Sequence, residues 1–262
     1  MYKIDLKNKK GIIFGLANEK SLAWGIAKLL DSSGAKLILA CQYDPLFQKE
    51  RFEKLSQVVD SLSGNHFLIS CDVQFEASVE KFFSKVKKHC SRLDFLIHSL
   101  AFAPRQALKN PFLETSRKEF LETLLVSSYS LIELTRMAEP LMKKKGSIVA
   151  LTYLGSERAV SHYNVMGSAK AVLEHDVKQL AFELGRKKKI RVNAISAGPI
   201  ETLSSRGIPE FSKILKIYEG KAPLGRIARE DVASLALFLV SDLSEKITGQ
   251  IIFVDGGYNI VL

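Results

Sequence analysis

The stretch "GIIFGLANEKSLAWG", residues 11–25, decides the fold of this chain. It opens with an apolar run of strand length, passes through a turn of small residues and continues into a stretch that favours a helix. Small residues in such a turn let backbone N–H groups approach a pyrophosphate, and the N-terminus of the following helix attracts the anion. The turn is not a GxGxxG motif, and glycine-containing turns between strand and helix also occur without any ligand. The residues expected to bind a cofactor here are Gly15, Ala17, Ser21 and Leu22.

Further apolar runs of strand length follow along the chain, and stretches of helical length such as "SVEKFFSKVKKHC" (78–90) separate them. Near-continuous apolar strands that alternate with helices indicate a parallel sheet covered on both faces. We therefore predict an α/β protein, a single Rossmann-type doubly wound domain over residues 1–262 with a seven-stranded parallel sheet flanked by helices. After 11–16, the predicted strands are "KLILAC" (36–41), "HFLISC" (66–71), "LDFLIHS" (93–99), "SIVALTY" (147–153), "IRVNAIS" (190–196) and "QIIFVD" (250–255).

Residues 198–225 are rich in Gly, Pro and Ser and break this alternation. An irregular segment beside a ligand crevice is a candidate mobile lid. We expect a substrate-binding lid at about 201–221.

Composition narrows the class of protein. Apolar residues make up 47% of 262 residues, and no apolar run approaches ~18 residues, so membrane insertion is not expected. Cys41, Cys71 and Cys90 form no CxxC or Cys/His cluster, which favours reduced, buried thiols in a cytoplasmic protein. The five histidines are scattered, so no metal site is expected.

The net charge of +10 is concentrated partly in two short basic runs, 143–145 and 186–189. We expect both runs at helix C-termini, where cations are favourable. The charge also permits an acidic partner, but no recognition motif supports nucleic-acid binding.

The carboxyl ends of the other predicted strands add to the nucleotide site, because ligands bind at that edge of an open α/β sheet. Asp72 and Val73 end the third strand and can bracket an adenine ring, although Asp72 can also cap the next helix. At the end of the fourth strand, small residues bring free backbone groups to the centre of the crevice: Ser99, Leu100 and Ala101.

The choice of dinucleotide depends on the end of the second strand. Gln42 stands where an NAD site usually has Asp or Glu for the ribose 2′-hydroxyl. No cation follows until Lys49, which leaves Lys20 in the turn as the one partner for a 2′-phosphate. NADH is therefore favoured over NADPH.

The stretch "YLGSERAVSHYNVMGSAK", residues 153–170, carries candidate catalytic groups. Tyr163 and Lys170 are seven residues apart, and on a helix that spacing is nearly two turns, ~10 Å of rise along one face. We expect both on one face near the start of a helix, where the ammonium would make the phenol more acidic and bind a ribose. An ordinary helix with an exposed lysine and a half-buried tyrosine shows the same pair.

The layout resembles short-chain dehydrogenase/reductases over essentially the whole chain, with two departures from their usual Tyr-x3-Lys and upstream Ser. Position 167 is Gly and position 150 is Ala. Tyr153, Tyr163 and Lys170, with Tyr-x6-Lys spacing, are similar instead to the divergent branch of enoyl-acyl-carrier-protein reductases of bacterial type II fatty-acid synthesis. The further matching motifs are "GLANEKSLAWG", "HSLAFAP", "RVNAISAGPIETL", "KAPLGR" and "GQIIFVDGGY".

This resemblance implies that NADH reduces the trans-2 double bond of an enoyl-acyl-carrier-protein thioester in the last step of the elongation cycle. It implies Tyr153, Tyr163 and Lys170 as catalytic residues and Ile200 and Thr202 as further cofactor contacts. The implied substrate contacts are Ala103, Tyr153, Tyr163, Leu203, Ile208 and Phe211, with Ile214 and Leu215 also facing the acyl chain.

The resemblance also implies partners. Acyl-carrier protein is expected to dock at the lid, where Arg206, Lys213 and Lys216 are the basic residues, and a homotetramer is expected. Three alternatives remain at this point: a reductase of ketones or alcohols, a nucleotide-sensing protein without catalysis, and a nucleic-acid binder suggested by charge alone.

Overall fold

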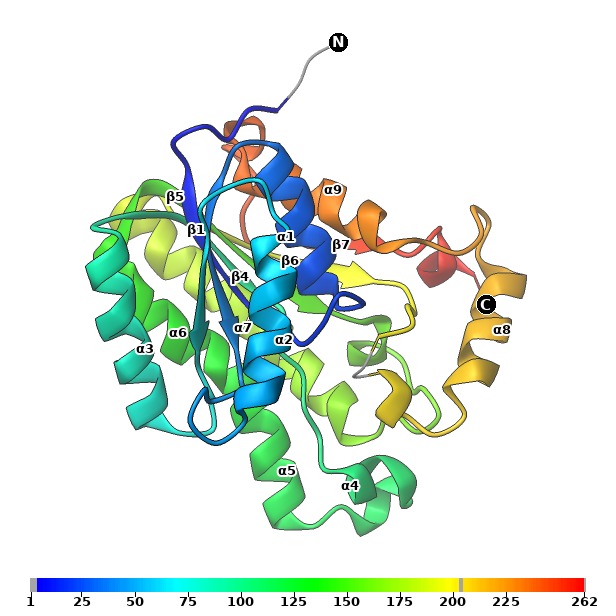
Figure 1. The fold of residues 1–262 in the computed structure, drawn as a ribbon. Coiled ribbons are helices and arrows are strands. Elements are labelled where there is room, and N and C mark those ends of the chain that lie inside the picture. Colours follow the sequence, from blue (N-terminus) through cyan, green and yellow to red (C-terminus); the bar gives the residue numbers. More distant parts are fainter. Residues whose placement is uncertain (1–3, 203–204, 262) are drawn as a thin grey trace.

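The computed structural model describes residues 4–202 and 205–261, and within them the chain forms a seven-stranded parallel sheet (Figure 1). The strand order is β3-β2-β1-β4-β5-β6-β7, which confirms the predicted Rossmann-type arrangement with a switch point between β1 and β4. The strands are β1 (Lys10–Phe14), β2 (Lys36–Cys41), β3 (Phe67–Ser70), β4 (Leu93–His98), β5 (Met142–Thr152), β6 (Arg191–Ala197) and β7 (Ile251–Val254).

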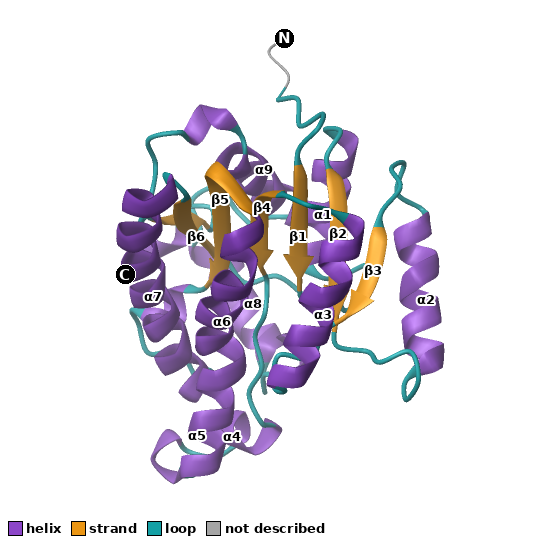
Figure 2. Ribbon diagram, turned by 90° about the vertical axis from the view of Figure 1, so that its left-hand side faces the viewer, coloured by secondary structure: helices purple, strands orange, loops and turns teal. Residues whose placement is uncertain are grey.

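Helices cover both faces of the sheet, and α4 and α5 lie beyond the carboxyl ends of the strands (Figure 2). A π-helical turn, η2 (Leu125–Tyr129), joins α5 to α6. The α-helices are α1 (Leu22–Ser32), α2 (Lys49–Asp60), α3 (Glu76–His89), α4 (Arg105–Lys109), α5 (Arg117–Leu124), α6 (Ser130–Ala138), α7 (Val165–Lys188), α8 (Phe211–Lys221) and α9 (Arg229–Val240).

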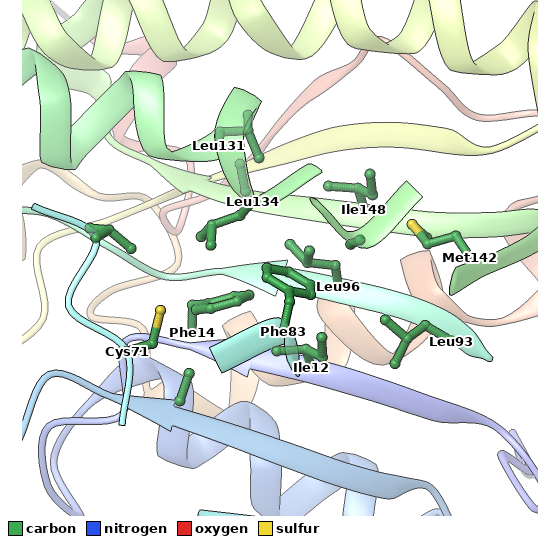
Figure 3. Packing of buried hydrophobic residues seen from close by; sticks show 14 of the residues in the cluster. Ile12, Phe14, Cys71, Phe83, Leu93, Leu96, Leu131, Leu134, Met142 and Ile148 are labelled. Atoms are coloured by element: carbon green, nitrogen blue, oxygen red, sulfur yellow. The ribbon is translucent and has the colours of Figure 1, made fainter. Parts of the chain in front are cut away.

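Two apolar clusters fix the helices to the sheet, one on each face. Successive strand residues point to opposite faces, so Ile12 joins the cluster under α3, α6 and α7 while Ile13 joins the one under α1, α2 and α9. In the first cluster, Leu96 of β4 lies between Phe14 of β1 and Ile148 of β5, and Phe83 and Leu134 come from the helices on this face (Figure 3). Each sheet face is thus buried, which matches the near-continuous apolar strands of the sequence.

Two sequence predictions about elements are wrong. Lys143–Lys145 lie inside β5 and not at a helix end, because β5 extends back along β4 through a register shift between Leu93 and Phe95. Carboxylates at that edge bind the run: Lys143 Nζ lies 2.9 Å from Asp94, and Lys145 Nζ lies 2.8 Å from Glu245. The second basic run does occupy the last turn of α7, as predicted. The irregular region 198–225 contains a helix, α8, that the sequence pattern did not indicate.

Three properties bear on the class of protein. Cys41, Cys71 and Cys90 are free and buried, as expected. No helix in the described ranges is long and apolar enough to span a bilayer. The same ranges contain no group of His, Cys, Asp or Glu that could hold a metal ion.

Candidate active site

A cavity of about 670 Å³ opens at the carboxyl ends of the strands, and predicted site residues from distant parts of the sequence line it. Leu203 lies outside the described residues. All the other predicted site residues line this cavity: Gly15, Ala17, Ser21, Leu22, Gln42, Asp72, Val73, Ser99, Leu100, Ala101, Ala103, Tyr153, Tyr163, Lys170, Ile200, Thr202, Ile208 and Phe211.

The turn after β1 leaves room for an anion at the start of α1. Gly15 adopts φ +94°, and a Cβ there would collide with the backbone of Ser99, so glycine is required for this approach of β1 to β4. Ser21 caps α1: its Oγ accepts from the N–H of Trp24 at 3.2 Å and donates to Asn18 O at 2.7 Å. The start of α1 lies at the cavity, since Ser21 and Leu22 line it, and a helix N-terminus favours an anion such as a pyrophosphate.

Residues that follow β2 and β3 line another part of the cavity. Asp72 does not cap α3, because that helix has Phe75 at its N-cap; its Oδ1 instead accepts from the N–H of Gln74 at 3.0 Å. Gln42 is exposed at the end of β2. The guanidinium of Arg51, on α2, sits over the ring of Tyr43 at 5.7 Å from its centroid.

The two tyrosines form an edge-to-face pair at the centre of the cavity. Their ring centroids are 4.8 Å apart with an interplanar angle of 70°, and Tyr163 is only 8% exposed. Within the described residues, neither phenol oxygen has a hydrogen-bond partner in the protein. Both hydroxyls are therefore available to a ligand.

Tyr163 does not lie on the helix, which corrects the prediction of one shared face with Lys170. Helix α7 begins at Val165, and Tyr163 belongs to the turn before it, between His162 at φ 60° and Asn164 at φ 40°. Asn164 holds this turn against α4, because its Nδ2 donates to Ala107 O at 3.1 Å and Asn110 O at 2.9 Å. Tertiary contacts, and not helical periodicity, thus place the phenol.

Two glycines allow the turn to approach the end of β5. A Cβ on Gly155 would collide with the ring of Tyr163, and a Cβ on Gly167 would lie 2.7 Å from Gly155 O. The position where most short-chain reductases have lysine therefore has no room for any side chain.

Lys170 projects from the first turns of α7 to the strand ends and is 4% exposed. Its Nζ donates to Leu151 O at 2.8 Å and to Leu100 O at 3.3 Å. An ammonium has three N–H donors, so one remains for a group in the cavity. Burial lowers the pKa of Lys170 to about 8, and the nearby Glu174 carboxylate opposes this shift.

The phenols are not made more acidic, contrary to the prediction. Burial raises the pKa of Tyr163 above its usual value, and Tyr153 and Glu174 raise it further. Burial also raises the pKa of Tyr153. The reason is that the Lys170 ammonium is directed at backbone carbonyls, so the phenols remain protonated donors at neutral pH.

The other end of the cavity is apolar. Tyr163 packs with Leu108 and Met166 in a small cluster separate from the two cores, and Ala103, Tyr153, Val160 and Ile208 surround it. Phe211 and Ile214 of α8 line the cavity, whereas Leu215 does not: it is 8% exposed and forms the buried side of α8 with Tyr218. Adjacent helix positions are rotated by about 100°, which separates Leu215 from its neighbour.

The sequence reasoning missed Arg105 and Met166, which also line the cavity. Arg105 begins α4 directly after the "HSLAFAP" motif, so its place beside that motif is the signal that could have found it. Met166 lies inside the Tyr-x6-Lys motif, where any apolar residue would look like ordinary helix packing.

Comparison with known proteins decides between the reductase classes. A family model described as "Enoyl-(Acyl carrier protein) reductase" matches residues 15–259. The chain belongs to this family. Enoyl-acyl-carrier-protein reductase (NADH) FabI of Rickettsia prowazekii is 45% identical over 257 residues, which cover 98% of this chain and 96% of that protein.

Two further family members differ in the cofactor that their names print. The Staphylococcus aureus relative is called enoyl-acyl-carrier-protein reductase (NADPH) FabI and is 45% identical over 98% of this chain and 99% of its own. The crystal structure of the Bacillus cereus reductase, described with NADP+ and indole naphthyridinone, superposes with a TM-score of 0.92 at 42% identity, covering 99% of both chains. Family membership thus confirms the resemblance and the fold, and it indicates a nicotinamide dinucleotide as the cofactor class.

Proposed function

We propose that this chain reduces the trans-2 double bond of enoyl-acyl-carrier-protein thioesters with NADH, giving the saturated acyl chain in the last step of the fatty-acid elongation cycle. The observation that carries the proposal is the cavity itself. Two protonated phenols and a buried ammonium lie between an anion-binding helix end and an apolar compartment. Residues 1–262 would act as one domain, with 201–221 as the substrate-binding lid.

The reaction assigns a role to each group. When bound, the reduced nicotinamide supplies a hydride to the β-carbon of the enoyl thioester. As the β-carbon accepts the hydride, the electron pair of the double bond shifts so that negative charge develops on the thioester oxygen, two carbons away, and a proton from solvent at the α-carbon then completes the saturated chain. Tyr163 donates a hydrogen bond to that oxygen, because its phenol is protonated and has no partner among the described residues. Tyr153, whose ring contacts Tyr163, lines the same place and assists it.

Lys170 binds the nicotinamide ribose through the N–H that the protein leaves free. The carbonyls of Leu151 and Leu100 hold the ammonium at the strand ends, so it is positioned before any ligand arrives. Ile200 and Thr202 contact the nicotinamide side of the cofactor from the loop after β6. Thr202 is bonded within this loop, because its N–H donates to Ser205 Oγ at 2.8 Å and its Oγ1 accepts from Ser205 N–H at 3.1 Å.

NADH is the proposed cofactor in preference to NADPH. Gln42 at the end of β2 is uncharged, and a 2′-phosphate gains most from a guanidinium or ammonium. Arg51 is held over the Tyr43 ring, which supports its use in packing and not in phosphate binding.

Exposed residues support two proposed partners, acyl-carrier protein and further copies of this chain. Acyl-carrier protein would dock beside α8, where Arg206 and Lys216 supply positive charge and Lys213 is paired with Glu210 at 2.6 Å. Val172 and Phe182 on α7 are 42% and 55% exposed, which supports burial of this helix between subunits of a homotetramer. A cytoplasmic location is proposed together with this reaction.

A single assay tests the proposed activity. The protein is mixed with NADH and a trans-2-enoyl pantetheine thioester, and NADH oxidation is followed by absorbance. We expect oxidation that depends on the thioester and yields the saturated acyl product. Oxidation with a β-keto thioester but not with the enoyl one would refute the proposal in favour of a ketone reductase.

A further inference from the structure

Glu174 is a buried carboxylate for which the proposed mechanism has no use. It lies on α7, one helical turn after Lys170, and is 8% exposed. Its Oε1 accepts from the hydroxyl of Thr152 at 2.6 Å, and Thr152, the last residue of β5, is 4% exposed. A carboxylate is rarely buried without a compensating charge, so its environment has to supply one.

One helical turn before Glu174 lies the buried ammonium of Lys170, which itself needs a counter-charge. No carboxylate oxygen of the described residues lies within ion-pair distance of Lys170 Nζ; its protein contacts are the carbonyls of Leu151 and Leu100. Side chains four residues apart on a helix lie on the same face, which places the Glu174 carboxylate beside the lysine stem. Thr152 fixes that carboxylate from the strand side.

We propose that Glu174, held by Thr152, is a positioning residue that keeps Lys170 charged at neutral pH, so that the ammonium can bind the nicotinamide ribose. This inference rests on the proposed function for its purpose, but the charge relation can be measured without the enoyl substrate. Both side chains are buried, and an opposite charge one helical turn away is screened less there than at the surface of the protein.

The other groups around Lys170 do not replace Glu174. On β4, His98 is fully buried, and its Nε2 lies 2.8 Å from Ser130 Oγ. The Ser130 hydroxyl donates to Val126 O at 2.6 Å, so His98 must donate from Nε2 and keep a bare Nδ1. Burial and the Lys170 charge lower the pKa of His98 to about 3, so His98 adds no charge near neutral pH.

The remaining titratable groups come from the other elements packed on α7. The phenols of Tyr153 and Tyr163 stay neutral because burial raises the pKa of each. Asp176, further along α7, is engaged by Ser128 of η2, whose Oγ donates to Asp176 Oδ2 at 2.7 Å. Glu174 is therefore the carboxylate whose charge Lys170 senses, and it opposes the effect of burial on the pKa of Lys170.

The test replaces Glu174 by Gln, which keeps the shape and the acceptor for Thr152 but removes the charge. NADH affinity is measured by calorimetry from pH 6 to 9.5 on the full chain. In the E174Q protein we expect the alkaline loss of affinity to begin about one pH unit lower than in the wild type, since an adjacent opposite charge shifts a pKa by about 1–3 units. At pH 8 this corresponds to roughly fivefold weaker binding, and at pH 6 the two proteins should bind alike.

Matched variants separate this effect from general damage. Glu183→Gln removes an exposed carboxylate from the same helix, where it only accepts from Gln179, and should leave the pH profile unchanged. Thr152→Val should reproduce part of the alkaline shift, and Thr152→Ser, which keeps the hydroxyl, should reverse it. An unchanged profile in folded E174Q, or an equal shift in E183Q, would overturn the inference.

Two further outcomes are decided by the same set. If E174Q does not fold, as judged by circular dichroism, coincident profiles for Thr152→Val and Thr152→Ser overturn the inference. If the wild type binds NADH but does not reduce the enoyl thioester, the proposed function fails while the charge relation between Glu174 and Lys170 is still measured.

Discussion

Replacing Tyr163 with Phe tests the central step of the proposed reaction. The substitution removes one hydroxyl and leaves the ring that packs against Leu108 and Met166. Because no described residue accepts from or donates to that hydroxyl, its removal breaks no hydrogen bond of the protein, and the fold should be unaffected. The whole effect should therefore fall on the transition state.

The size of the effect follows from the state of the phenol. Burial raises the pKa of Tyr163, so its phenol is a protonated donor whose ring is fixed by the packing around it. Loss of one such donor to a developing oxyanion typically costs about 10²–10³ in kcat, or ~2.7–4 kcal/mol. NADH affinity should be unchanged, because Lys170 is held by the carbonyls of Leu151 and Leu100 and not by Tyr163.

The assay compares kcat for an enoyl thioester and calorimetric NADH affinity in the wild type, Tyr163→Phe and the matched control Tyr153→Phe. We expect a smaller loss for the control, since Tyr153 is the flanking ring of the pair. Turnover within threefold of the wild type in Tyr163→Phe would refute the reasoning. A larger loss in Tyr153→Phe would transfer the donor role to that residue.

Three further outcomes follow from the same geometry. NADH affinity of the wild type should fall as pH rises through about 8, where Lys170 loses its proton in the folded protein. The unfolded chain keeps that proton up to the ordinary pKa of 10.5. The contribution of Lys170 to the free energy of unfolding should therefore rise between pH 8 and 10.5, because the unfolded chain then binds more protons. Gly167→Ala places a Cβ 2.7 Å from Gly155 O, and denaturant unfolding should show a loss of about 1–3 kcal/mol with a fall in kcat. Phe211→Ala should raise KM for long acyl chains more than for a four-carbon one, because Phe211 lines the apolar end; equal effects on both would contradict that contact.

Much of the fold could be predicted because each apolar run is of strand length and is separated from the next by a stretch of helical length, which is typical of a buried parallel sheet. The run 36–41 became β2 with the same bounds, and the others differ from their strands mainly at the ends. The convergence of the predicted site residues has a related reason: carboxyl ends of parallel strands meet at one edge, so residues after six different strands had to converge. The strand boundaries indicated the residues at the nucleotide end, whereas Ile200, Thr202 and the substrate contacts came from the family resemblance.

The predictions that were wrong concern residues whose positions depend on contacts with segments distant in the sequence. The lysines at 143–145 could not be placed from local pattern, since their partners Asp94 and Glu245 come from distant segments. Tyr163 was assigned to a helix because the spacing allowed it, whereas Asn164 binds the α4 segment and holds the turn open. The Thr152–Glu174 bond joins residues 22 apart, and no periodicity marks it.

The geometry also explains why this chain departs from the usual short-chain reductase motif. A lysine at position 167 has no room, because its Cβ would lie 2.7 Å from the carbonyl oxygen of Gly155. Moving the lysine to position 170 brings its ammonium between the carbonyls of Leu151 and Leu100, at the ends of β5 and β4. The spacing changes along the helix, and the ammonium still reaches the strand ends.

The missing upstream serine has a similar explanation, and it argues against ketone reduction. Ala150 is fully buried in the sheet beside His98 and belongs to the core under α7, so it does not line the cavity. The hydroxyl nearest along β5 is that of Thr152, and it is already donated to Glu174. A ketone reductase needs a donor at the carbon that receives the hydride, whereas the Thr152 hydroxyl of this chain is engaged by Glu174 and the two phenols are free to donate. Phenols that are free to donate suit the oxyanion that forms, in the proposed reaction, two carbons away from the site of reduction.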